Sequence, residues 1–118
     1  MRGSPFLGIL LFGFSWVAPV GDTGKARAEG DAAKGRTLAQ TECARCHGRD
    51  GNARSTSVQV VPMLAGQPAA YLVQEMLNYA EGIRKDTSRN GNMAKKLQEL
   101  GTQDFEDIAA FYAAQKRY

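Results

Sequence analysis

The feature that most constrains this chain is a single pentapeptide, Cys43-Ala44-Arg45-Cys46-His47, which contains every cysteine and histidine in the sequence. The 118 residues hold only two cysteines and one histidine. A disulfide between cysteines this close in sequence closes a very short loop, so it would stabilise the fold little. A disulfide scaffold is therefore excluded, and the pentapeptide has to be explained by its chemistry.

The pattern C-x-x-C-H is the attachment signature of c-type haem. Two thiols about one helical turn apart can each add to a vinyl group of one porphyrin, which forms two thioether bonds. His47 directly follows the second cysteine, where its ring can donate a nitrogen to the iron. The sequence therefore predicts one haem c, attached covalently through Cys43 and Cys46, with His47 as a ligand of the metal.

Alternative roles for the pentapeptide are less well supported. A thioredoxin-like C-x-x-C site needs a βαβ setting, and the sequence shows no such pattern. A zinc site needs at least three ligands in tetrahedral geometry, which two cysteines and one histidine crowded into five residues do not readily supply. Chance placement is the remaining alternative, and the convergence of all three residues on one segment argues against it.

The N-terminal segment has the features of a secretory signal peptide. A cation, Arg2, precedes an apolar stretch that runs from Pro5 to Val20. This stretch is shorter than the roughly 20 apolar residues that a membrane-spanning helix needs. Ala26 and Ala28 form an A-x-A site, so we predict cleavage after Ala28. An uncleaved anchor is the alternative interpretation.

Cleavage would divide the chain into a signal peptide, residues 1–28, and one mature domain, residues 29–118, exported to the periplasm. It removes three cations and one anion, which lowers the formal net charge from +3 to +1. Charge therefore gives no support to nucleic-acid binding, and no membrane span is expected after cleavage. A domain this small buries a modest share of its surface, so a large apolar cofactor would add useful core.

The residue pattern of the mature domain predicts an all-α fold. Asp31 is the expected N-cap of a first helix that runs into the Cys43 region. Residues Gly48–Gly66 are expected to form a long loop, and ordered loops of that length are usually functional. The only short run rich in β-branched residues, Ser57–Val61, is stopped by Pro62.

The second half of the domain predicts the remaining helices. A second helix is expected from Pro68 to Gly82, with an apolar stripe at helical spacing. A short helix that buries Leu97 should end at Gly101, and Thr102 should cap the last helix. The architecture is thus three main helices, one short helix and a long loop.

The mature chain resembles a class I cytochrome c, most closely the short bacterial periplasmic monohaem type. The resemblance implies a cytochrome c-like fold around the haem, with Gly35 at the crossing of the first and last helices, opposite Phe111 or Tyr112. It covers nearly all of the mature chain. The matching segments are GRTLAQTECARCHG (35–48), PMLAGQPAAYL (62–72), EGIRK (81–85), the Met93 loop and DFEDIAAFYAAQ (104–115).

The resemblance implies His47 as one axial ligand and a methionine as the other. Met76 lies on the apolar stripe of the second helix, so core packing explains it better. Met63 follows Pro62, which in this family lies on the histidine side, where its carbonyl is expected to accept the second ring proton of His47. Met93 lies in the later loop, where the family carries its methionine ligand.

A second interpretation of Met93 stays open. Its spacing to Leu97 and Leu100 is also that of an apolar helix stripe, which would place Met93 in the core. The resemblance and the known affinity of haem iron for a thioether opposite histidine favour ligation. The predicted cofactor-binding residues are therefore Cys43, Cys46, His47 and Met93, and the predicted metal ligands are His47 and Met93.

An iron with both axial positions filled has no open site for a substrate, so the expected function is one-electron transfer and not catalysis. The expected partners are a redox donor and a redox acceptor protein. One alternative is a haem c relay subunit of a periplasmic dehydrogenase or oxidoreductase complex. The other is a haem enzyme or gas sensor with an open iron position, which requires that Met93 does not ligate.

Cations crowd the region around Met93, where Asp86 is the only anion between positions 84 and 96. One interpretation is that these cations form a basic surface near the haem edge that steers an acidic redox partner. The other is a solvated helix face with no such role. The five cations are Arg84, Lys85, Arg89, Lys95 and Lys96.

Overall fold

The computed structural model describes residues 30–118, together with Gly3 and Gly13. The predicted signal peptide, apart from those two glycines, and the predicted cleavage site after Ala28 lie outside the described residues. Within residues 30–118, no helix is both long and apolar enough to cross a membrane.

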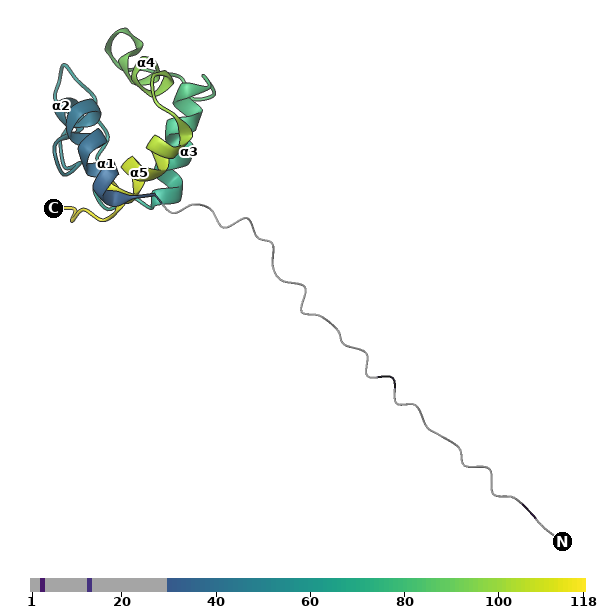
Figure 1. Ribbon diagram of the computed structural model, residues 1–118. Helices are drawn as coiled ribbons and strands as arrows, with labels where there is room; N and C mark the ends of the chain where they lie inside the picture. The colour runs from purple at the N-terminus through teal and green to yellow at the C-terminus, as the bar shows by residue number, and fades with distance from the viewer. Residues whose placement is uncertain (1–2, 4–12, 14–29) are drawn as a thin grey trace.

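Residues 30–118 form helices and loops and contain no strand (Figure 1). This confirms the predicted all-α fold, including the long loop between the first and second helices. The elements in chain order are α1 (Ala32–Leu38), the π-helical η1 (Ala39–Cys43), α2 (Ala44–His47), α3 (Ala69–Ala80), the 3-10 helix η2 (Arg89–Gly91), α4 (Asn92–Gln98) and α5 (Thr102–Ala113).

The first three elements form one uninterrupted helical segment, residues 32–47. Its N-cap is Asp31, as predicted, whose carboxylate accepts hydrogen bonds from the amides of Ala33 (2.9 Å) and Lys34 (3.1 Å). The π-helical turn follows Leu38 and ends at Cys43. A π turn within an α-helix is rare and is often found at a functional site, and here it leads directly into the pentapeptide.

The α1 and α5 backbones cross in contact at Gly35. Gly35 is buried, and a Cβ atom at this position would collide with the carbonyl oxygen of Asp107 and approach the amide of Ile108. The crossing therefore lies one turn earlier on α5 than the predicted position opposite Phe111 or Tyr112. The carboxylate of Asp107 strengthens it by accepting a hydrogen bond from the amide of Asp31 at 2.7 Å.

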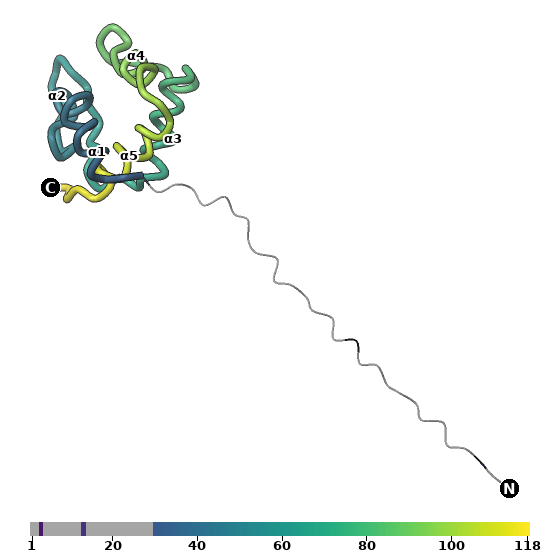
Figure 2. The backbone as a smooth tube through the Cα atoms, viewed as in Figure 1, coloured from purple at the N-terminus to yellow at the C-terminus, as the bar shows by residue number. Residues whose placement is uncertain are grey.

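α3 and α5 pack against each other and supply most of the core. Met76 is buried on α3, as predicted, and Leu97 is buried on α4. Helices α3 and α5 form the base of the fold, and Figure 2 shows residues 32–47 on one side of this base and α4 on the other. The larger buried side chains of the core cluster are Leu72, Val73, Met76, Leu97, Phe105, Ile108, Phe111 and Tyr112.

Some predicted boundaries shift by one or a few residues. Pro68 is the N-cap of α3 and precedes its first turn, and Gly101, not Thr102, precedes α5 as its N-cap. The carboxylate of Asp104 accepts a hydrogen bond from the amide of Gly101 at 2.9 Å and so caps that end. Gly82 follows the end of α3 with φ +73°, which is the left-handed conformation expected of a terminating glycine.

We predict that Gly35→Ala lowers the free energy of unfolding of the haem-loaded protein by about 1–3 kcal/mol, because the new methyl group forces two helix backbones apart. Alanine is the better helix former by about 1 kcal/mol, so a gain in stability would show that the helices do not cross in contact. Gly101→Ala is the steric control, since its nearest atom would lie 3.7 Å away; because Gly101 is an N-cap, this variant should lose about 0.5–1 kcal/mol, less than Gly35→Ala. Urea denaturation of both variants gives the comparison.

Candidate haem-binding site

The pentapeptide spans the junction of η1 and α2. Cys43 is the last residue of η1, and Cys46 and His47 end α2. Both cysteines are free thiols; Cys43 is half-buried against the core and Cys46 is exposed. Residues three apart on a helix are surface neighbours, so the two thiols can reach one bound group. Burial, followed by the nearby Glu42 charge, raises the pKa of Cys43 to about 11.

The imidazole of His47 is buried and held by one hydrogen bond. Its Nδ1 atom lies 3.0 Å from the carbonyl oxygen of Pro62, to which it donates its proton. Burial lowers the pKa of His47, while the hydrogen bond to Pro62 opposes that shift. The ring is thus kept neutral, and among residues 30–118 its Nε2 atom makes no hydrogen bond, so this nitrogen is available to a metal.

The long loop folds back on itself and so brings Pro62 to His47. The carbonyl of Gly51 accepts hydrogen bonds from the amides of Leu64 (2.8 Å) and Ala65 (3.1 Å). The hydroxyl of Ser55 donates to the carbonyl of Val61 (3.0 Å) and accepts from the amide of Val61 (2.8 Å). These bonds fix both sides of Pro62, so the residue that orients the imidazole is itself held in place.

The C-terminal tail fastens this loop from the other side. The buried Asn52 side chain donates to the carbonyl of Lys116 (2.8 Å) and accepts from the amide of Tyr118 (3.3 Å). The Tyr118 hydroxyl donates to the carboxylate of Asp50 (2.7 Å), and this bond is the main reason why the pKa of Asp50 is lowered. Sequence reasoning missed Asn52 and Asp50, because their partners lie more than 60 residues away.

Met93 lies in the first turn of α4, and not in a loop as the resemblance implied. Its side chain is half-buried and packs against the core cluster, as its helical spacing to Leu97 predicts. Its amide donates to the hydroxyl of Ser88 (3.0 Å), and the carboxylate of Asp86 accepts from the amides of Ala94 and Ser88, both at 2.8 Å. Burial would raise the pKa of Asp86, but these hydrogen bonds lower it on balance. The start of α4 is therefore rigidly defined.

The other two candidate methionines occupy the places that the sequence analysis assigned to them. Met76 is buried in the core on α3, and Met63 is half-buried in the loop directly after Pro62. Met93 is on α4, which faces the pentapeptide from the opposite side of the base formed by α3 and α5 (Figure 1). Of the three, Met93 lies on the element that opposes His47.

The described residues fit a c-type haem. They provide two free thiols in helical register, a neutral imidazole with one ring nitrogen unused, and a half-buried thioether on the opposite side. Thioether and imidazole are both established ligands of haem iron. Cys43 and Met93 pack against the same apolar core as other partly buried side chains such as Leu64 and Leu77.

Comparison with known proteins identifies the domain. The cytochrome c family model matches residues 32–114, which is most of the chain. The chain belongs to the cytochrome c family. Membership confirms the predicted resemblance to class I c-type cytochromes and supports haem c as the cofactor of the domain.

Individual relatives of this cytochrome differ in length. Cytochrome c4 of Pseudomonas aeruginosa is 40% identical over 102 residues, which cover 86% of this chain and 47% of that protein. Cytochrome c-554(548) of Halomonas halodenitrificans is 39% identical over 90 residues, which cover 74% of this chain and 99% of that protein. The chain thus spans about half the length of the cytochrome c4 proteins, but it matches the second relative almost end to end.

A solved structure supports the fold of the cytochrome. The crystal structure of reduced recombinant cytochrome c4 from Pseudomonas stutzeri superimposes with a TM-score of 0.61, covering 72% of this chain and 48% of that one. At 24% sequence identity this likeness shows the fold alone.

We predict that Gly51→Ala destabilises the loop that carries Pro62 more than Gly66→Ala does. Both glycines have positive φ, so each substitution costs about 1 kcal/mol of backbone strain. A Cβ atom at position 51 would also lie 2.7 Å from Ala65 N and from the Tyr112 ring, which adds about 1–3 kcal/mol. At position 66 the nearest atom is 3.4 Å away. Equal unfolding free energies in urea would contradict this packing.

Proposed function

We propose that this cytochrome is a periplasmic one-electron carrier whose haem c is attached through Cys43 and Cys46 and ligated by His47 and Met93. The observation that carries the proposal is the buried imidazole of His47, held by the Pro62 carbonyl beside the two free thiols. The A-x-A site at Ala26 and Ala28 supports export.

Each side chain has a distinct part in this function. Cys43 and Cys46 hold the porphyrin permanently, and the Pro62 carbonyl keeps the imidazole in one orientation and increases its basicity. The hydrogen bonds of Asp86 and Ser88 hold the backbone at Met93, so its sulfur is presented from a fixed position. The bound haem supplies a reversible one-electron couple, and a thioether ligand in apolar surroundings favours its reduced state.

A second candidate function follows from the length of the relatives. The chain spans about half of the cytochrome c4 proteins that it matches, so its domain is a unit that also occurs within longer proteins. The same site could then relay electrons within a larger complex. Gel filtration of the native protein separates the two functions, because a free carrier elutes at the size of one domain and a relay subunit elutes with its partner.

We predict that the protein, matured in a host with haem-attachment machinery, contains one haem that resists extraction into acidified organic solvent. The two thioethers should also give a c-type pyridine haemochrome spectrum. Cys46→Ala should leave a single thioether and shift that spectrum measurably. Recovery of a colourless protein from such a host, or of free haem in the solvent, would contradict the proposed attachment.

We predict that Met93→Ala abolishes the sulfur-to-iron absorption band of the oxidised protein, because the sixth ligand is removed. Met63→Ala is the matched control: Met63 is also half-buried, and it lies on the histidine side of the loop. The control should keep the band unchanged. If Met93→Ala keeps the band and Met63→Ala loses it, the assignment of the two methionines is reversed.

The cations around Met93 divide into paired and unpaired groups. Arg84 forms an ion pair with Glu75 and lies 4.8 Å from the centre of the Tyr79 ring. Lys96 forms ion pairs with two carboxylates, those of Glu42 and Glu99. Among the described residues, the exposed side chains of Lys85, Arg89 and Lys95 have no anionic partner. These three unpaired cations, which we call the basic rim, can attract an acidic redox partner.

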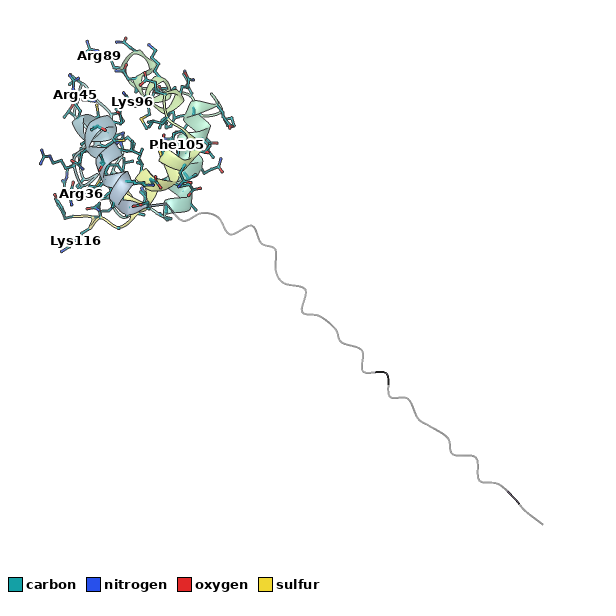
Figure 3. All side chains as sticks on the ribbon, viewed as in Figure 1. Arg36, Arg45, Arg89, Lys96, Phe105 and Lys116 are labelled. Atoms are coloured by element: carbon teal, nitrogen blue, oxygen red, sulfur yellow. The ribbon has the colours of Figure 1, made fainter. Side chains whose placement is uncertain are left out.

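We predict that neutralising the basic rim (Lys85→Gln, Arg89→Gln and Lys95→Gln together) slows oxidation by the anionic reagent hexacyanoferrate(III) about tenfold at low salt. A control triple variant removes the same charge at Lys34, Arg36 and Lys116, of which Arg36 and Lys116 lie at the end opposite Arg89 (Figure 3). The control should slow oxidation much less. Equal oxidation rates for both variants, or a wild-type oxidation rate that does not change with salt, would favour the interpretation that these cations only form a solvated helix face.

A further inference from the structure

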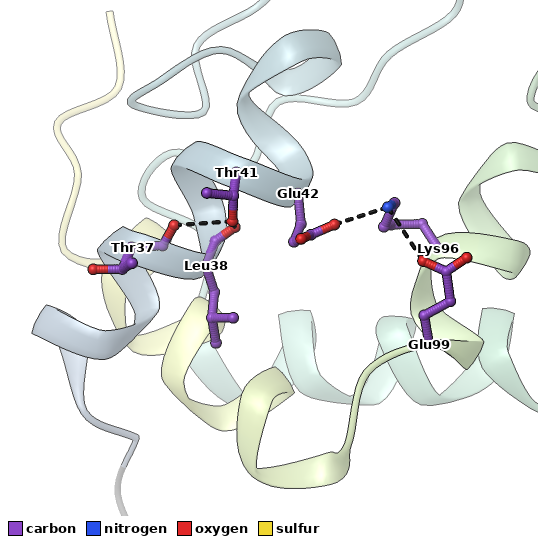
Figure 4. Close-up of polar contacts among 6 residues, drawn as sticks. All are labelled: Thr37, Leu38, Thr41, Glu42, Lys96 and Glu99. Atoms are coloured by element: carbon purple, nitrogen blue, oxygen red, sulfur yellow. Dashed lines mark hydrogen bonds and ion pairs between the residues drawn. The ribbon is translucent and has the colours of Figure 1, made fainter.

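One ion pair connects the haem-attachment segment, which comprises η1 and α2 (residues 39–47), to α4, the helix that carries Met93. The Lys96 Nζ atom on α4 lies 2.8 Å from Glu42 Oε2 on η1, although the two residues are 54 positions apart in sequence (Figure 4). Glu42 directly precedes Cys43, and Lys96 follows Met93 by three positions, almost one turn of α4. The pair therefore links residues adjacent to the proposed attachment site and to the proposed second ligand.

No other polar contact among the described residues makes this connection. Within residues 30–118, the Glu42–Lys96 pair is the only hydrogen bond or ion pair between residues 39–47 and α4. The two sides are otherwise anchored separately, because α1 packs on α5 whereas α4 packs on α3. Apolar packing on the shared core therefore positions each side, and this pair is the polar contact that joins the two sides directly.

The surroundings of Lys96 favour a persistent pair. Its side chain is 39% exposed and that of Glu42 is 29% exposed, so both are partly shielded from water. A second carboxylate, Glu99, lies 3.3 Å from the same Nζ atom and is itself 68% exposed. The hydrogen bonds to Glu42 and Glu99 raise the pKa of Lys96, so the ammonium stays charged across the physiological range.

We propose that Glu42 and Lys96 form a latch that holds α4 closed against the haem-attachment segment and thereby keeps the Met93 sulfur on the iron. Both are positioning residues, because they act through Met93. Opening of α4 moves Lys96 and Met93 together, since they are neighbours on one short rigid helix. This inference rests on the proposed ligation by Met93.

The latch is tested by ligand exchange in the oxidised, haem-loaded protein. Imidazole, used at a pH above its pKa so that it is neutral, can bind the iron only after the Met93 sulfur leaves, so its saturating binding rate reports the opening of α4. Lys96→Met should raise this rate about threefold, which is the size expected for a partly exposed ion pair. Lys95→Met is the matched control, because it removes the same charge from an exposed side chain one residue away. This control should leave the imidazole binding rate unchanged.

Two further variants separate the latch from a general structural effect. Lys96→Arg keeps the charge and should restore most of the wild-type rate, and Glu42→Gln should match Lys96→Met, with no further increase when both are combined. Added salt should speed imidazole binding in the wild type but not in Lys96→Met, because salt screens an ion pair that the variant lacks. The melting temperature should change little in all of these variants.

The outcomes distinguish this inference from the proposed ligation. If Lys96→Met and Glu42→Gln both keep the wild-type rate while Met93→Ala loses the sulfur band, Met93 ligates the iron and the latch does not exist. If Met93→Ala keeps the band, the ligation and the latch both fail. A rate that rises equally in Lys95→Met and Lys96→Met would show that net charge, not the ion pair, controls opening.

Discussion

The direct backbone contact of α1 with α5 at Gly35 is the constraint on which the rest of the structure depends. It sets the position of the helical segment that carries Cys43 and His47. The same α5 supplies Tyr112, whose hydroxyl donates to the carbonyl of Gly48 (3.2 Å) directly after the pentapeptide. One helix thus holds the attachment segment near both of its ends, and a side chain at position 35 would disturb everything attached to it.

This arrangement explains why covalent attachment suits a domain of this size. A small chain can bury only a limited apolar surface, and here the core is concentrated where α3 and α5 meet. The attachment segment and α4 stand on either side of that base (Figure 1), and Cys43 and Met93 both pack against its core, so a large apolar group held by both would enlarge the core that they share. Two thioether bonds would keep that group in place even where the surrounding core is thin.

Sequence reasoning succeeded where the deciding contacts are local. The Asp31 cap, the Gly82 terminus and the buried Met76 all follow from residues within one or two turns. The Pro62 carbonyl at His47 was predicted only through the family resemblance, since 15 residues separate the two. The register of the Gly35 crossing and the ties from Asn52 to the C-terminal tail were not predictable, because helix periodicity does not determine which turn of a distant helix is met.

Two of the ion pairs around Met93 could not be predicted from the sequence for the same reason: they join residues that are distant in the chain. A count of cations between positions 84 and 96 treats all five as equivalent, but their partners lie elsewhere in the chain: Glu75 for Arg84 and Glu42 for Lys96. Successive residues on a helix point about 100° apart, so Lys95 faces solvent while its neighbour Lys96 faces the attachment segment. Two adjacent lysines therefore differ in their surroundings: Lys95 is exposed and has no anionic partner among residues 30–118, whereas Lys96 connects two parts of the fold through its pair with Glu42.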